Sequence, residues 1–157
     1  MDAEISLSKI RSASLSYISR REFCRADLTE KLSKRFEAPD LIEQCLDWLE
    51  ELDYLNDQRY AAMFLRSAVG RRRGPNRVKL EMQRKGLGAH HIEVAFVESE
   101  VDWFELALDR LGSKFREPEG DFKEKSKRYR YMQSQGFTGD QIQYALSNVS
   151  YEKSLAS

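Results

Sequence analysis

Residue types that favour β-strands are scarce in this sequence. Its 157 residues include only six valines, six isoleucines and two threonines, and strands draw on these types. Three prolines and eight glycines are also few, so long helices can run unbroken. The sequence therefore predicts an all-α protein.

The sequence also lacks the marks of several protein classes. Its longest uncharged run, 141–151, is polar and much shorter than the ~20 apolar residues of a membrane-spanning helix. No basic segment followed by an apolar one opens the chain, so we expect no secretory signal. Two cysteines exclude a disulfide scaffold and a four-cysteine zinc site. We predict a soluble protein of the cytoplasm with no membrane contact.

No constellation of catalytic or metal-binding residues is evident. His90 and His91 are adjacent, so they cannot share one face of a helix. Cys45 occupies a position that is alanine in two later copies of the repeat described below, which indicates a small core residue. We therefore expect no catalytic residues, no metal and no cofactor, and a protein that is not an enzyme.

Charge is segregated along the chain although the net charge is zero. Residues 37–57 carry eight acids and no base, 66–85 carry eight bases against Glu81, and 123–130 carry five bases against Glu124. Such segregation gives local fields that a polyanion would sense. Solvated helix faces are the alternative interpretation. Tyr129 and Tyr131 interleave with the last bases, as in surfaces that combine phosphate contacts with stacking. The candidate binding residues are Arg71, Arg72, Arg73, Arg77, Lys79, Arg84, Lys85, Lys123, Lys125, Lys127, Arg128 and Arg130.

An internal repeat of about fifty residues organises the sequence. Gly86 and Gly136 fall in register, and each has the position of a glycine that ends a helix. Each repeat contains three helical runs, so the sequence predicts an elongated, curved tandem array of three three-helix repeats. The first copy of the pattern is Leu28, Leu32, Phe36, Ile42, Cys45 and Leu46, the second is Val78, Met82, Gly86, Ile92, Ala95 and Phe96, and the third is Arg128, Met132, Gly136, Ile142, Ala145 and Leu146.

The repeat also suggests domain boundaries. We expect repeats over 13–55, 56–101 and 102–149, with a tail over 150–157 at the C-terminal side. Six of the first nineteen residues are serine and large apolar groups are few, so we expect a flexible tail over 1–12.

Four segments resemble the motifs of a known family, in order and at the family's spacing. They span about residues 14–147, and through them the chain resembles the RecX family of bacterial modulators of the RecA recombinase. The segments are Arg21-Glu22-Phe23-Cys24-x-x-Asp27-Leu28-x-x-Lys31-Leu32, Leu55-Asn56-Asp57-Gln58-Arg59-Tyr60-Ala61, Gly74-Pro75-x-Arg77-Val78-x-x-Glu81-Met82-x-x-Lys85-Gly86-Leu87, and Lys125-x-Lys127-x-x-Arg130-Tyr131-Met132 followed by Gly136-Phe137.

The resemblance implies a regulator without catalytic activity. RecX-like proteins bind lengthwise in the groove of the RecA–DNA filament and dampen its ATPase, strand exchange and coprotease activity. They thereby regulate DNA repair, homologous recombination and the SOS response. The implied partners are the RecA nucleoprotein filament and single- and double-stranded DNA, bound by a monomer. Two alternatives stay open on the residues themselves: a helical-repeat protein that binds DNA without a recombinase, and a helical scaffold for another protein.

The chain departs from the family pattern at four places. Cys24 replaces a capping serine, Asn56 replaces the first residue of an aspartate pair, and Phe36 replaces a turn glycine. Residues 71–73, all arginine, stand where the family tends to have a lysine-glycine-aromatic step. The loop before Gly74 thus loses a flexible glycine and gains charge.

Overall fold

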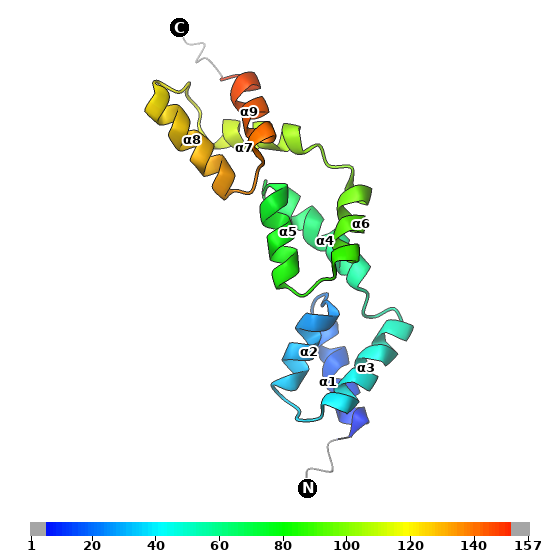
Figure 1. Cartoon of the computed structure of the whole chain (residues 1–157). Coiled ribbons are helices and arrows are strands. Elements are labelled where there is room, and N and C mark those ends of the chain that lie inside the picture. Colours follow the sequence, from blue (N-terminus) through cyan, green and yellow to red (C-terminus); the bar gives the residue numbers. More distant parts are fainter. Residues whose placement is uncertain (1–5, 152–157) are drawn as a thin grey trace. The chain divides into compact units, whose positions relative to one another are not determined.

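The computed structural model describes residues 6–151, and within them all regular structure is helical. Helices follow one another in three sets of three, which confirms the predicted all-α fold built from three-helix repeats (Figure 1). No helix of the described residues is long and apolar enough to cross a membrane. The helices are α1 (Leu7–Ile18), α2 (Arg25–Ser33), α3 (Pro39–Glu51), α4 (Asp57–Gly70), α5 (Pro75–Arg84), α6 (Ala89–Ser99), α7 (Trp103–Lys114), α8 (Phe122–Ser134) and α9 (Gly139–Asn148).

The same repeat positions are buried in all three copies. Side chains there have exposed fractions of at most 6%, as expected for the inward stripe of an amphipathic helix. The fifty-residue periodicity of the sequence is therefore the periodicity of the core. These positions are Leu32, Met82 and Met132; Ile42, Ile92 and Ile142; and Cys45, Ala95 and Ala145.

Two compact units contain these repeats, and each is described by itself. The first comprises the described residues up to Met63 together with Met82–Ala95. In it, α1, α2 and α3 pack around one apolar cluster that includes Leu28, Leu46 and Leu49. The hydroxyl of Ser14 lies 3.3 Å from the thiol sulfur of Cys45 inside this cluster.

The second unit comprises Phe64–Glu81 together with the described residues from Phe96 onward. Its main cluster lies where α7 packs against α9 and α8. Leu111, Met132 and Ile142 are fully buried there. The hydroxyl of Thr138 caps α9 in a capping box with Gln141, which fixes the direction in which α9 leaves the preceding turn.

The predicted flexible tail over 1–12 is wrong where the structure describes it. Ser6 caps α1 by accepting a hydrogen bond from the Lys9 amide at 3.2 Å, and the helix begins at Leu7. Ile10 is fully buried in the first cluster. Serine content misled the prediction because one serine is a helix cap and another, Ser14, is buried. Residues 1–5 and 152–157 of the two predicted tails lie outside the described residues, and the three boundaries between repeats stay predictions.

Candidate basic binding surface

The arginines before and within α5 are engaged in ion pairs. Arg73 and Arg77 share the carboxylate of Glu81, with N–O distances of 2.9 and 3.3 Å. Arg72 pairs with Asp109 of α7 at 2.6 Å. These five side chains keep one net positive charge, so much of the predicted patch is neutralised within the second unit. Exposed pairs of this kind contribute only ~0–1 kcal/mol, so they do not prevent a phosphate from competing.

Arg72, in the loop before α5, takes a glycine-like backbone conformation. Its φ is 57°, in the left-handed region that residues other than glycine rarely adopt. Arg71, whose side chain is exposed, precedes it and directly follows α4. The loop thus keeps the turn that a glycine would make, and Arg72 gains the ion pair with Asp109.

The loop before α5 meets the turn between α8 and α9 by direct backbone contact. The Gly74 amide donates to the carbonyl of Gln135 at 2.8 Å, and the Asn76 amide donates to the carbonyl of Gly136 at 2.9 Å. A Cβ added at Gly74 would lie 2.3 Å from the carbonyl carbon of Gly136. Gly136 has φ of 99°, and a Cβ there would lie 2.4 Å from the Cβ of Arg77. Both glycines are therefore required by the approach of two backbones.

A matching contact lies in the first unit, fifty residues earlier. The Cys24 thiol donates to the carbonyl of Lys85 at 3.4 Å. Gly86 has φ of 88°, and a Cβ added there would lie 2.5 Å from the Cβ of Ala26. The Cys24 side chain makes no cap hydrogen bond to α2, and the carboxylate of Asp57 instead accepts from the Arg25 amide at 2.7 Å.

On α8, three predicted cations form one exposed stripe, which we call the α8 stripe: Lys123, Lys127 and Arg130. At 3.6 residues per turn they lie within about 60° of one another around the helix axis. Among residues 6–151, no carboxylate lies within ion-pair distance of these three side chains. Lys125 is exposed too, but it lies about 200° around the axis from Lys127.

Arg128 is not part of this exposed set. Its side chain is only 6% exposed and pairs with Glu124 at 2.9 Å and Glu119 at 3.8 Å. It donates to the Tyr151 hydroxyl at 3.1 Å, and its guanidinium lies 4.6 Å from the centre of the Phe115 ring. Arg128 therefore holds the end of the third repeat together and is not available at the surface. The repeat contained the signal, because the two earlier copies of this position are the buried residues Leu28 and Val78.

The three remaining predicted residues lie on α5 or directly after it. Lys79 is exposed, with its ammonium 5.0 Å from the centre of the Phe96 ring in the second unit. Lys85 belongs to the first unit and pairs with Asp27 at 3.8 Å. Arg84 is exposed at the end of α5 and belongs to the first unit as well.

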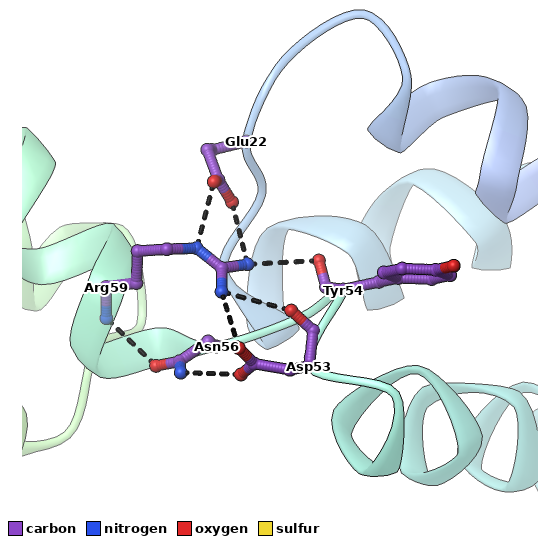
Figure 2. Close-up of polar contacts among 5 residues, drawn as sticks. All are labelled: Glu22, Asp53, Tyr54, Asn56 and Arg59. Carbon is purple, nitrogen blue, oxygen red and sulfur yellow. Dashed lines mark hydrogen bonds and ion pairs between the residues drawn. The ribbon is translucent and has the colours of Figure 1, made fainter.

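Arg59, a residue whose role no pattern in the sequence indicates, organises the link from α3 to α4 (Figure 2). Its guanidinium donates to Glu22 at 2.9 Å and to the carbonyls of Asp53 and Tyr54 at 3.0 and 3.3 Å. Asn56 caps α4 by accepting from the Arg59 amide at 2.9 Å, and its side chain donates to Asp53 at 2.8 Å. Asparagine is a good cap, so the departure at residue 56 preserves the helix start.

Arg110 of α7 is a second residue with a structural role that the sequence did not indicate. Its guanidinium donates to the Gln135 side chain at 3.0 Å and to the carbonyl of Arg71 at 3.4 Å. It also lies 5.5 Å from the centre of the Tyr131 ring. Arg110 thus braces the contact between the Gly74 loop and the Gly136 turn, a role that no local pattern in the sequence indicates.

The two cysteines are buried packing residues. Burial raises the pKa of the Cys24 thiol and the pKa of the Cys45 thiol. Both stay protonated at neutral pH, and a protonated thiol is a poor nucleophile and a poor metal ligand. Among residues 6–151, no group of three His, Cys, Asp or Glu side chains is placed to hold a metal ion. That the chain is not an enzyme stays a prediction.

Comparison with known proteins gives matches to one family. A family model described as the second three-helix domain of RecX matches residues 56–95, and one described as its third three-helix domain matches residues 100–146. The regulatory protein RecX of Pseudomonas putida is 37% identical over 140 residues, covering 88% of this chain and 89% of that protein. The regulatory protein RecX of Acinetobacter baylyi is 32% identical over 154 residues, covering 96% of this chain and 94% of that protein.

Solved structures share the fold. The crystal structure of RecX from Lactobacillus salivarius superposes with a TM-score of 0.78 at 24% identity, covering 90% of this chain and 94% of that one. A crystal structure described as regulatory protein RecX gives a TM-score of 0.80 at 21% identity, covering 90% of this chain and 73% of that one.

Proposed function

Since the chain belongs to the RecX family and is a regulatory protein of the RecX type, we propose that it binds the RecA nucleoprotein filament and dampens its ATPase, strand exchange and coprotease activity. It acts in the cytoplasm as a monomer, and through RecA it regulates DNA repair, recombination and the SOS response. The observation that carries the proposal is the α8 stripe of Lys123, Lys127 and Arg130, exposed on a three-helix domain that matches the family model.

The chemistry required for this function is binding, not catalysis. A regulator shifts a filament only by as much as it binds one filament state better than another. Exposed cations favour the state that presents DNA phosphates or acidic protein surface to them. The predicted arginine patch before α5 is largely neutralised by Glu81 and Asp109. We therefore assign the main electrostatic contact to α8, and a supporting contact to the loop at 71–73.

Co-sedimentation with preformed RecA filaments tests the proposal. The full chain should pellet with filaments assembled on single-stranded DNA and stay in the supernatant when both RecA and DNA are left out. Naked DNA of the same length and concentration is the control for the alternative function, a helical-repeat protein that binds DNA without a recombinase. Pelleting with naked DNA alone would favour that alternative, and no pelleting with filaments would refute the proposal.

A further inference from the structure

The second helix of the third repeat differs from its two counterparts at its N-terminal end. By the fifty-residue register, Lys125 corresponds to Arg25 and Pro75, which are the first residues of α2 and α5. Helix α8 begins three residues earlier, at Phe122, so it has nearly one additional turn. Asp121 caps this turn by accepting from the Glu124 amide at 2.9 Å.

The additional turn occupies a place that is covered in the other repeats. In the first and second repeats, the segment just before this helix contacts the turn of the following repeat, through Cys24 and Gly74. The third repeat has no following turn among residues 6–151. In the described chain, the N-terminal end of α8 is therefore not covered by another repeat. Its exposed side chains are not needed for a contact with a neighbouring repeat.

The first residue of this turn is a phenylalanine whose side chain is largely exposed among the described residues. Phe122 has an exposed fraction of 83%, whereas aromatic side chains ordinarily bury most of their surface. It lies about 100° around the helix axis from Lys123 and about 80° from Arg130, next to the α8 stripe. An open aromatic ring beside a row of cations is the combination that holds single-stranded nucleic acid, since the cations contact phosphates and the ring stacks on a base.

Among the described residues, the nearest acids lower the net charge of this end of the helix but pair with none of the three cations. The carboxylates of Glu119 and Glu124 both pair with the buried Arg128. The carboxylate of Asp121 is engaged in the helix cap. The three cations of the α8 stripe consequently stay available to a polyanion, along roughly 10 Å of helix at a rise of 1.5 Å per residue.

We propose that the N-terminal end of α8 is a binding site for single-stranded DNA, with Phe122 stacking on an unpaired base and Lys123, Lys127 and Arg130 contacting the phosphates. This proposal rests on the proposed function and names the filament component that this face engages. Bases of a duplex are stacked on one another, so the Phe122 ring has an exposed partner only in a single strand. The site should therefore prefer single strands over duplex.

Fluorescence anisotropy with a labelled oligothymidylate tests the proposal on the full chain. Phe122→Ala should weaken binding ~5–150-fold, the range that corresponds to ~1–3 kcal/mol per stacked base. Its salt dependence should not change, and Phe122→Trp should restore affinity. The triple alanine variant of Lys123, Lys127 and Arg130 should instead reduce the slope of log K against log salt by up to about 2, at ~0.7 per phosphate contact on a single strand.

Matched controls separate stacking from general effects. Val97→Ala removes another apolar side chain with an exposed fraction of 74%, and Lys34→Ala removes an exposed lysine at the C-cap of α2. Both variants should bind the oligonucleotide as the wild type does. Wild-type affinity in Phe122→Ala, or an equal loss of duplex binding, would overturn the proposal. RecA ATPase assays on the same variants test the regulator separately: inhibition by a variant that no longer binds the oligonucleotide would leave the proposed function standing and remove this site from it.

Discussion

The two contacts between successive repeats use the same turn but different chemistry. In the first junction, residues 24–27 meet the turn at Lys85 and Gly86, and side chains make the contact. In the second junction, residues 74–77 meet the turn at 135–136, and two backbone hydrogen bonds make it. A contact made by one side chain can be replaced by a contact made by a different side chain. Two backbones in direct contact leave no room for a side chain between them. We infer that the second junction is the less tolerant of substitution.

Substitution of the second-junction glycines should give the largest effect. Gly74→Ala and Gly136→Ala each place a Cβ within 2.4 Å of neighbouring atoms, and Gly136 also has a left-handed backbone. We expect each to lower the free energy of unfolding by about 3 kcal/mol, from overpacking in both variants and from backbone strain as well in Gly136→Ala. Urea unfolding followed by circular dichroism measures the loss. Gly70→Ala is the matched control, because nothing lies within 4 Å of a Cβ there; an equal effect in Gly70→Ala and Gly74→Ala would contradict the account.

The first junction should show a smaller loss that a second substitution relieves. Gly86→Ala meets only the Cβ of Ala26, at 2.5 Å, and carries the strain of its positive φ. We expect a loss of about 2 kcal/mol. In a double-mutant cycle with Ala26→Gly, a favourable coupling of about 1 kcal/mol should appear because the clash is removed. Strict additivity of the two substitutions would show that the turn does not approach Ala26 as described.

Removal of the cap of α2 tests a smaller difference between the two junctions. Asp57→Ala removes the acceptor of the Arg25 amide and should cost ~1 kcal/mol, the usual value of a helix cap. At the corresponding position, Pro75 has no amide hydrogen and needs no acceptor. Cys24→Ser should recover part of the loss by supplying a cap within α2, which thermal unfolding of the single and double variants would detect. No recovery would mean that residue 24 is held away from the helix start.

The ion pair of the first junction should contribute least. Lys85 and Asp27 lie 3.8 Å apart and the Lys85 side chain is 42% exposed. We expect Lys85→Ala to change the free energy of unfolding by no more than about 0.5 kcal/mol, and less in high salt. Chemical denaturation at low and high salt measures both. A loss that is larger and independent of salt would indicate that the lysine's alkyl chain, not its charge, matters.

The helices and the core could be predicted from the sequence because both follow one periodicity. Positions such as Met82 and Met132 are buried in register, and the glycines at 86 and 136 end their helices with positive φ. In a fifty-residue repeat, the burial predicted for a position in one copy can be checked against the same position in the other copies. The first helix was placed too late because its starting signal is a single residue, Ser6.

Which of the predicted binding residues are exposed could not be predicted from charge alone, because charge does not show which side chains form ion pairs. By charge alone, Arg73 and Arg128 look equivalent to Lys127, yet Arg73 shares Glu81 and Arg128 is buried against Phe115; only the repeat register distinguishes Arg128. Such contacts join residues that are distant in the sequence or separated by one helical turn. The same pattern of charges along the sequence is therefore compatible with a paired side chain and with an exposed one. The cap that Asp57 gives to Arg25, across 32 residues, is hidden for the same reason.

Charge reversal on α8 tests the central claim most directly. In an assay of the DNA-dependent ATPase of RecA, the wild-type chain should inhibit at concentrations where it does not coat DNA alone. The variant with Lys127→Glu and Arg130→Glu should fold normally by circular dichroism and lose this inhibition, since both residues lie on the α8 stripe. Lys125→Glu should have a smaller effect because it lies on another side of the helix. Full inhibition by the double variant would contradict the assignment of the main contact to α8, and no inhibition by the wild type would contradict the proposed function.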